Sequence, residues 1–294
     1  METPFGQVLT AMVTPFTAEG ELDYGQAWRL ARFLIDNGSD GIVVAGTTGE
    51  SPTLGDHEKV ALFKTVVEAV GERGKVVAGT GTYDTAHSVE MSKRAADLGC
   101  AGIMAVTPYY SKPPQEGLFR HFAAIADSTG LPLLVYNIPG RTSRLIEVET
   151  LQRLAAHPNI VATKDAVEDV DFTAKTAEAV GDSMAIYSGQ DSLTLPLMRV
   201  GAIGVVSVAA HLAGPWIARM VDAAAKGDWE EAERLHDLLM PLNTALFVEP
   251  NPMPLKGALE RVWERVGEPR LPLVPASDET VDAVEQALGK VQQS

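Results

Sequence analysis

The sequence predicts an α/β fold, a closed (β/α)8 TIM barrel followed by a C-terminal helical extension. Eight short runs rich in valine and isoleucine alternate with longer amphipathic stretches as far as about residue 225. The runs show little alternation of polar and apolar residues, which is typical of parallel strands covered by helices. Eight strand–helix units in a stretch of this length favour a closed barrel over an open, doubly wound sheet.

Each strand run is followed by a segment long enough to form a helix. The run QVLTAMVTP precedes a helical pattern that starts at Asp23, a residue type that caps helix N-termini. GIVVAG leads into a helix from about Asp56, and KVVAGTG leads into one from about Thr85. The remaining five predicted strands are GIMAVTP, PLLVYNIP, IVATKDA, MAIYSG and GVVSVAA.

We divide the chain into a barrel that contains the active site, residues 1–225, and an extension, residues 226–294. Beyond residue 225 the strand signals stop, and three helical patterns are separated by proline-rich turns: DWEEAERLHDLLMPLNTALF, PLKGALERVWERV and DETVDAVEQALGKV. We expect the extension to pack on the barrel as structural cover or as an oligomer contact, rather than to take part in catalysis.

Composition and charge argue against several kinds of partner. The 294 residues are 46% hydrophobic and 21% charged, as in folded soluble proteins, and carry a formal net charge of −15. This charge argues against binding to nucleic acids or to anionic membrane surfaces, because both rely on Lys and Arg side chains. The sequence contains neither a dinucleotide-binding glycine loop nor a phosphate-binding Gly-Lys-Ser/Thr loop.

Cysteine content and the N-terminal sequence bear on redox chemistry and location. Cys100 is the only cysteine, so the chain can form no internal disulfide and has no cysteine cluster for a metal. Its surroundings, LGCAGIM, indicate packed core rather than a catalytic thiol. The N-terminus lacks the pattern of a signal peptide, and no apolar run approaches the roughly 20 residues that span a bilayer. We expect a cytoplasmic protein.

The candidate site residues follow the predicted strands, because barrel enzymes place their chemistry at the carboxyl ends of the strands. With these strand assignments, the side chains converge on one barrel mouth. The residues expected there are Thr47, Thr48, Tyr109, Tyr110, Tyr136, Arg141, Lys164, Gly189, Val206 and Ser207.

Lys164 stands at the end of the apolar run in PNIVATKDAVED. One interpretation is a lysine that pairs with Asp165 or another acidic neighbour, and the other is a nucleophile that forms a Schiff base. An ordinary lysine is uncharged in only about one molecule in 2,500 at pH 7. Lowering its pKa by about 3 units through burial would raise that fraction to about a third. The position and the apolar neighbours favour the nucleophile.

Hydroxyl groups at the same end are candidates for proton transfer and for substrate binding. Tyr136 and Tyr110, linked through Thr47, can relay a proton to bulk water, although each tyrosine alone is also explained as a half-buried aromatic side chain. Thr48 and nearby backbone N–H groups can hold a carboxylate, or the hydroxyl can cap a turn. Arg141 can bind a second carboxylate with two hydrogen bonds, or lie on the surface.

With these residues in place, the chain resembles the dihydrodipicolinate synthase family of pyruvate-dependent class I aldolases. The motifs that carry the resemblance occur in order over essentially the whole chain: GTTGES, TPYYSKPPQEGL, YNIPGRT, IVATKDA and FVEPNPMPLK. The resemblance implies a barrel with a helical extension, assembled as a homotetramer from two dimers. It also implies condensation of pyruvate with L-aspartate-4-semialdehyde to 4-hydroxy-tetrahydrodipicolinate, in lysine and diaminopimelate biosynthesis, with no metal or organic cofactor.

The resemblance also implies a role for the residue at the end of the sixth strand. Lys164 resembles the lysine that forms the Schiff base with pyruvate, and Gly189 and Val206 match positions whose backbone lies beside it. The imine then acts as an electron sink and tautomerises to an enamine, which attacks the aldehyde.

Further functional residues of the family map onto matching positions here. Tyr136, Thr47 and Tyr110 resemble the proton-relay triad, in which Tyr110 would reach into the site of a neighbouring subunit. Thr48 is similar to the residue that binds the carboxylate of pyruvate, and Arg141 to the one that binds the carboxylate of the semialdehyde.

Family members that are inhibited by lysine bind it at a subunit interface, through a set that includes histidines, an asparagine and a glutamate. The corresponding positions here are Asp56, Lys59, Tyr83 and His87. Tyr83 and His87 replace an asparagine and a glutamate that would hold the ammonium group of the effector, and Lys59 adds like charge. We therefore expect weak or absent feedback inhibition by L-lysine. Tyr109 adjoins this region, and an interface role is expected for it.

Two alternatives and one departure from the family stay open at this point. N-acetylneuraminate lyases and 2-keto-3-deoxy sugar-acid aldolases share the barrel, the lysine and a tyrosine, but Arg141 and the pair Thr47-Thr48 favour the synthase. A non-catalytic relative that binds keto acids is the other alternative, and the complete set of site residues argues against it. Val167-Glu168 stand where many members carry Thr-Gly, which leaves open how the loop after Lys164 affects the site.

Overall fold

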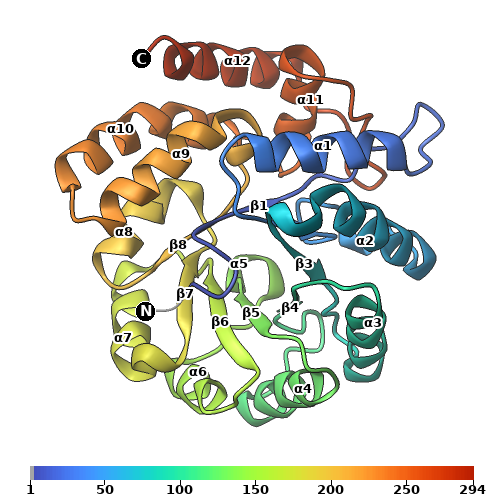
Figure 1. The fold of residues 1–294 in the computed structure, drawn as a ribbon, viewed down its shortest axis with the longest axis vertical. Helices are drawn as coiled ribbons and strands as arrows, with labels where there is room; N and C mark the ends of the chain where they lie inside the picture. The colour runs from blue at the N-terminus through green and yellow to red at the C-terminus, as the bar shows by residue number, and fades with distance from the viewer. Residues whose placement is uncertain (1–2) are drawn as a thin grey trace.

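The computed structural model describes residues 3–294 and confirms the predicted closed barrel of parallel strands with a C-terminal helical extension. The strands pair in chain order, and β8 closes the barrel against β1. In Figure 1 the strands form the centre and the helices surround them. The strands are β1 (Val8–Ala11), β2 (Gly41–Val44), β3 (Lys75–Gly79), β4 (Gly102–Val106), β5 (Leu133–Asn137), β6 (Ile160–Asp165), β7 (Ala185–Ser188) and β8 (Gly204–Ser207).

The first three helices begin where the sequence predicts them. The Asp23 side chain accepts a hydrogen bond from the Gln26 amide at the start of the first helix. The next two helices begin at Asp56 and Thr85, as predicted. The helices around the barrel are α1 (Tyr24–Asp36), α2 (Asp56–Val70), α3 (Thr85–Asp97), α4 (Gln115–Asp127), α5 (Pro139–Thr142), α6 (Val148–Ala155), α7 (Val170–Val180), α8 (Thr194–Arg199) and α9 (Ala210–Ala225).

The barrel interior and the layer between strands and helices form two separate apolar cores, because side chains alternate along each strand. Ala162 of β6 and Tyr136 of β5 belong to the interior core. Tyr187 of β7 is also inside, and its hydroxyl donates to the Gly6 carbonyl, 2.7 Å away, before the start of β1. Cys100 is 3% exposed and lies in the outer core, which confirms its prediction as packed core.

Three helices form the extension: α10 (Trp229–Ala245), α11 (Met253–Val262) and α12 (Asp278–Gln292). Helix α10 packs on α9, and α12 packs on both α10 and α11. In Figure 1, α11 and α12 lie at the top of the view, beyond α1 and away from the barrel centre. The predicted division at residue 225 coincides with the end of α9, and its meaning as a domain boundary stays a prediction.

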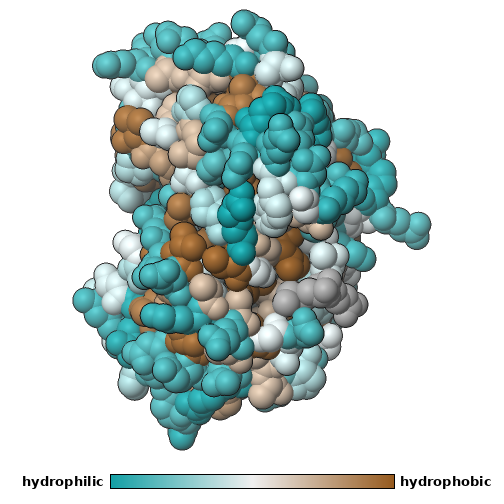
Figure 2. All heavy atoms as spheres, turned by 90° about the vertical axis from the view of Figure 1, so that its left-hand side faces the viewer, coloured by the Kyte–Doolittle hydropathy of each residue, from teal (hydrophilic) through white to brown (hydrophobic). Residues whose placement is uncertain are grey.

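Hydrophilic side chains cover much of one face of the molecule (Figure 2). Figure 2 shows the face on the left of Figure 1, where hydrophilic groups surround smaller hydrophobic areas near the middle. In the part of the chain that the structure describes, no helix has the length and apolar character needed to cross a membrane.

Candidate active site

Lys164 and Tyr136 lie side by side at the carboxyl ends of β6 and β5. The two strands pair in parallel, with the Cα atoms of these two residues opposite each other. Because side chains alternate along a strand, Lys164 points to the same side as Ala162, toward the barrel interior. Its Nζ atom lies 4.2 Å from the centre of the Tyr136 ring. The sheet register therefore brings together two residues that came from separate motifs.

Asp165 is not the partner of Lys164. The two residues are consecutive in β6, so their side chains point to opposite faces of the sheet. The Asp165 carboxylate accepts hydrogen bonds from the Val167 amide at 2.9 Å and from Thr173 Oγ1 at 2.7 Å. The alternative interpretation of Lys164 as a lysine paired with Asp165 is therefore wrong.

The surroundings of Lys164 favour the uncharged amine. Only 5% of the residue is exposed, and burial is the main cause that lowers its pKa to about 8. The negative charge of Asp191 raises this pKa, and the positive charge of Arg141 lowers it. At pH 7 about one lysine in ten would then be uncharged, because the charged form has been disfavoured by about 3 kcal/mol. Such an amine can attack a carbonyl carbon near neutral pH.

Asp191 is a candidate functional residue that the sequence did not reveal. It is 5% exposed, and its carboxylate accepts hydrogen bonds from Ser207 Oγ at 2.5 Å and from the amides of Val208 and Ala209 at 2.8 and 3.2 Å. Burial raises the pKa of Asp191, while these hydrogen bonds and the charge of Lys164 lower it. The carboxylate thus holds the chain at the end of β8 and places negative charge near the lysine. The only local signal was an aspartate soon after the seventh predicted strand.

Tyr136 is placed to exchange protons with Thr47. Burial raises the pKa of the Tyr136 hydroxyl to about 12, whereas the charge of Arg141 and the nearby Thr47 hydroxyl lower it. The hydroxyl is therefore protonated at neutral pH and first acts as a donor. Tyr136 and Thr47, two members of the predicted relay, thus line the same two cavities within one chain.

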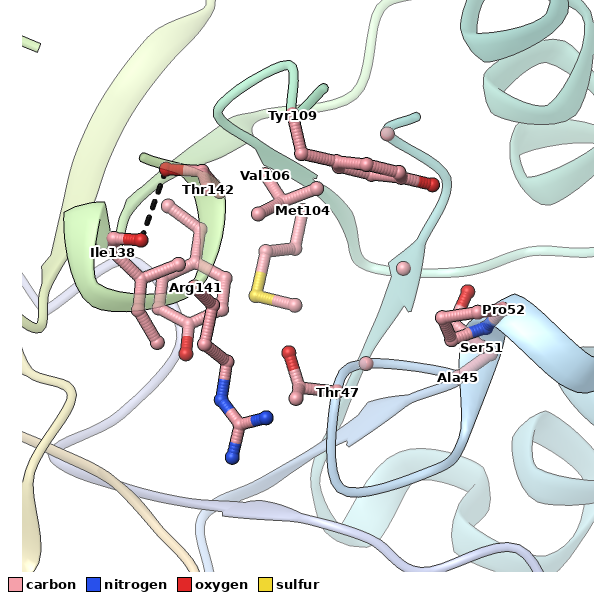
Figure 3. A pocket seen from close by; sticks show the side chains of 14 residues that line it. Ala45, Thr47, Ser51, Pro52, Met104, Val106, Tyr109, Ile138, Arg141 and Thr142 are labelled. Atoms are coloured by element: carbon pink, nitrogen blue, oxygen red, sulfur yellow. Dashed lines mark hydrogen bonds between the residues drawn. The ribbon is translucent and has the colours of Figure 1, made fainter. Parts of the chain in front are cut away.

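Two adjoining cavities occupy the barrel mouth. The one at Lys164 has a volume of about 580 Å³, within the range of about 300–1,000 Å³ for small-molecule sites. Four residues line both cavities: Thr47, Tyr136, Ile138 and Arg141. Figure 3 shows the second cavity, where the Arg141 side chain extends toward Thr47, and Met104 lies between Arg141 and Tyr109 in this view. Among residues 3–294, no group of three or more His, Cys, Asp or Glu side chains is placed to hold a metal ion.

Thr48 lies at the Lys164 cavity and is held by the extension. Its hydroxyl accepts a hydrogen bond from Asn251 Nδ2 at 2.9 Å. Asn251 and the preceding residues 247–250 line the same cavity. The expectation that the extension serves as cover is therefore incomplete, because the loop after α10 forms one wall of the site. In the sequence, Asn251 is noted only as part of the motif FVEPNPMPLK, and no role is predicted for it.

Gly189 lies directly against Lys164. A Cβ atom on Gly189 would come within 3.1 Å of Lys164 Cε and 2.8 Å of Ala166 Cβ, so the missing side chain leaves room for the lysine. Val206 is packed in the interior core, and Val208 rather than Val206 lines the Lys164 cavity. Substrate binding by Gly189 and Val206 stays a prediction.

Val167 and Glu168, the pair that departs from the usual Thr-Gly of the family, also line the Lys164 cavity. Glu168 has a φ angle of +65°, in the left-handed region that favours glycine. The backbone thus keeps the conformation that a glycine adopts easily. The departure changes the wall of the cavity and not only the loop.

Tyr110 does not line either cavity of its own chain. Its side chain is 94% exposed. Among the predicted catalytic residues it is the one that the fold of a single chain leaves outside the site. A role in the site of a neighbouring subunit stays a prediction.

The predicted regulatory residues gather near the N-terminal ends of α2 and α3. His87 Nε2 lies 2.9 Å from the Asp56 carboxylate, and the Tyr83 ring packs edge-on against Tyr109 with 5.2 Å between centres. Lys59 is 6% exposed, and burial lowers its pKa while the charge of Asp56 raises it. The Asp56 carboxylate is thus engaged by His87, and the response to L-lysine stays a prediction.

Comparisons with known proteins identify one family. The family model described as the dihydrodipicolinate synthetase family matches residues 4–291. A 4-hydroxy-tetrahydrodipicolinate synthase of Moorella thermoacetica is 53% identical over 285 residues, 97% of each chain. One of Synechococcus elongatus is 51% identical over 286 residues, 97% of this chain and 96% of the relative. The structure of the enzyme from Cyanidioschyzon merolae with lysine bound has a TM-score of 0.97 and 45% identity, and the match covers 100% of both chains.

Proposed function

The chain belongs to the dihydrodipicolinate synthase family, and we propose that Lys164 is the nucleophile of its reaction. The protein is a lyase of the class I aldolase type, which condenses pyruvate with L-aspartate-4-semialdehyde to 4-hydroxy-tetrahydrodipicolinate in lysine and diaminopimelate biosynthesis. One observation carries the role of Lys164. A buried lysine with a lowered pKa faces a tyrosine at the barrel mouth.

The reaction begins with the uncharged amine of Lys164. The amine attacks the keto carbon of pyruvate, and loss of water leaves an imine. The protonated imine withdraws electrons from the methyl carbon, which loses a proton to give an enamine. The enamine carbon then attacks the aldehyde carbon of the second substrate and forms the new carbon–carbon bond. The amino group of the semialdehyde finally attacks the imine carbon, which closes the ring of the product and displaces the amine of Lys164.

Tyr136 and Thr47 carry the protons that these steps require. The protonated Tyr136 hydroxyl can donate to the oxygen that leaves during imine formation, and Thr47, which lines the same two cavities, can exchange a proton with it. In this proposal Tyr110 completes the relay from a neighbouring subunit, which agrees with the exposure of its side chain.

Two carboxylates must be held in the adjoining cavities. We assign the pyruvate carboxylate to Thr48 and the backbone N–H groups near it, because Thr48 lines the Lys164 cavity. The carboxylate of the semialdehyde is assigned to Arg141, which lines both cavities and whose guanidinium can form two parallel hydrogen bonds. Arg141 also favours the synthase over the sugar-acid aldolases, because the aldehyde part of their substrates has no carboxylate for Arg141 to bind.

Trapping and assay together test the proposal. Incubation with pyruvate and borohydride is expected to add one reduced pyruvate per chain, on the peptide that contains Lys164, as read by mass spectrometry. The same preparation is expected to condense pyruvate with the semialdehyde faster than it cleaves N-acetylneuraminate or 2-keto-3-deoxygluconate. An unmodified Lys164 would end the proposed mechanism, and faster sugar-acid cleavage would reassign the substrate.

The reaction should speed up with pH as Lys164 loses its proton. Because the pKa of Lys164 is lowered to about 8, kcat/KM for pyruvate is expected to rise about tenfold per pH unit below pH 7 and to level off above about pH 9. Steady-state rates at saturating semialdehyde, measured from pH 6 to pH 10, check this profile.

Two variants should move the profile in opposite directions. Arg141→Met removes a positive charge that lowers the pKa of Lys164, so the midpoint is expected to shift to higher pH. Asp191→Asn removes a negative charge that raises this pKa, and the midpoint should shift to lower pH. Shifts in the same direction, or a profile without a midpoint between pH 7 and pH 9, would contradict the account.

The protein acts on small-molecule substrates, and we propose that it does so in the cytoplasm as a homotetramer. The family resemblance supports both proposals, and the exposed rings of Tyr83 and Tyr110, which are 61% and 94% exposed, are suited to contacts between copies of the chain. Weak inhibition by L-lysine is supported by the pairing of Asp56 with His87, which leaves this carboxylate less available to an ammonium group.

A further inference from the structure

The loop that carries Thr47 and Thr48 is held in a strained conformation. This loop, residues 46–50, is called the GTTGE loop below. It follows Ala45, which has a φ angle of +53°, and ends at Glu50, which has a φ angle of +56°. Both angles lie in the left-handed region, which is unfavourable for residues with a side chain and persists only where the surroundings impose it. The contacts at Glu50 therefore decide whether the loop keeps this shape.

The C-terminal extension binds both carboxylate oxygens of Glu50. Oε1 lies 2.7 Å from Lys256 Nζ of α11, and the two side chains are 1% and 2% exposed. Oε2 accepts a hydrogen bond from the backbone amide of Arg270 at 2.8 Å. Loss of one partner from such a buried ion pair is strongly unfavourable, because the other charge is left unpaired away from water.

Further contacts fix Lys256 and Arg270 themselves. Lys256 Nζ and Arg270 Cζ lie 4.2 and 4.4 Å from the centre of the Phe16 ring. The Arg270 guanidinium binds both carboxylate oxygens of Glu58 in α2, at 2.6 and 2.9 Å. The Lys256 ammonium also donates to the Glu268 carbonyl at 3.3 Å. The extension thus meets Glu50 with a fixed set of groups rather than with one flexible side chain.

We propose that Lys256 is a positioning residue for pyruvate: by holding Glu50, it keeps the GTTGE loop in the shape that places Thr47 and Thr48 at the cavity. Lys256 lines neither cavity at the barrel mouth and acts only through the loop. This inference rests on the proposed function, in which Thr48 binds the pyruvate carboxylate. It gives the extension a part in substrate binding.

The test compares the two substrates in the full-length protein. Lys256→Met keeps the side-chain length and removes the charge, and it is expected to raise the KM for pyruvate about tenfold, since a loop displaced by about 1 Å loses alignment with the carboxylate. The KM for the semialdehyde should stay within about twofold, because Arg141 comes from α5 and not from the loop. A variant that is merely less stable would not show a rise in the KM for pyruvate alone.

Two more variants keep the test decisive. Glu50→Gln breaks the same ion pair with a nearly isosteric side chain, and it should raise the KM for pyruvate in the same way even where Lys256→Met fails to fold. Arg261→Met is the matched control, because it removes ion pairs with Asp278, Asp282 and Glu285 inside the extension. It is expected to lower the thermal midpoint without changing either KM.

The outcomes separate this inference from the proposed function. A wild-type protein that forms no Lys164 adduct with pyruvate and borohydride would remove the function on which the inference rests. The other outcome concerns only the role of Lys256. If the wild type is active, and folded Lys256→Met and Glu50→Gln both have a pyruvate KM within twofold of the wild-type value, this role is overturned while the proposed function stands. A selective rise in the pyruvate KM of either variant, absent in Arg261→Met, would support it.

Discussion

The Lys164→Met variant is expected to lose at least about 10³-fold in kcat/KM for the condensation. Methionine has a similar length and suits a buried position, so the fold should be kept, but it has no amine to form the imine. Without the imine, pyruvate has no electron sink, and its methyl group does not become nucleophilic. Initial rates at varied pyruvate and saturating semialdehyde measure the loss, and mass spectrometry after borohydride should find no adduct.

Lys75→Met provides the matched control for this variant. Lys75 is also a strand lysine, but it begins β3 and therefore lies at the opposite end of the barrel. Its replacement should leave the rates within about twofold of wild type and should not prevent trapping of pyruvate. Equal thermal midpoints would show that both variants are folded. A folded Lys164→Met protein with more than a tenth of wild-type activity would rule out Lys164 as the nucleophile.

Tyr136→Phe is expected to lower kcat by about 10²–10³-fold, as loss of a proton-transfer group commonly does. The substitution removes only the hydroxyl and keeps the ring that lies 4.2 Å from Lys164 Nζ, so the lysine should keep its surroundings. The rate should therefore fall at every pH, while the midpoint of its pH dependence stays near pH 8. Single-turnover trapping of pyruvate should slow as well, because imine formation needs the same proton.

Tyr187→Phe is a suitable control, since Tyr187 is another buried tyrosine of the barrel interior. Tyr187 stands opposite Lys164 in the neighbouring strand β7, but its hydroxyl donates to the Gly6 carbonyl before β1, so its loss should reduce stability by about 1 kcal/mol with little effect on kcat. If Tyr136→Phe and Tyr187→Phe reduced kcat equally, the effect would come from packing and not from proton transfer.

Much of the barrel could be predicted because its signals are local. Apolar runs with little alternation marked the strands, and residues such as Asp23 and Thr85 marked where helices begin. Lys164 was found because a charge at the end of an apolar run is unusual in a buried strand. Its alternative pairing with Asp165 was wrong for an equally local reason, since neighbours in a strand face opposite sides.

The parts of the site that escaped prediction depend on contacts between distant segments. Asn251 meets Thr48, and Lys256 meets Glu50, only because the extension folds back onto the loop after β2. Neither segment has a periodicity or a residue spacing that predicts these contacts. Asp191 was missed because it is marked by its burial and by the hydrogen bonds that it accepts from the amides after β8. Neither property can be read from a sequence.

The proposed role of Tyr110 in a neighbouring subunit predicts how the protein responds to dilution. The backbone of Tyr110 adopts a φ angle of +67°, and its ring projects from the chain with 94% of its surface exposed. A side chain that completes the relay of another copy makes the rate depend on how many copies are in contact, which is set by mass action. Below the dissociation constant of the assembly, the activity per chain would fall with total concentration while each chain stayed folded. The amount of protein in the cell would then regulate the reaction without any effector.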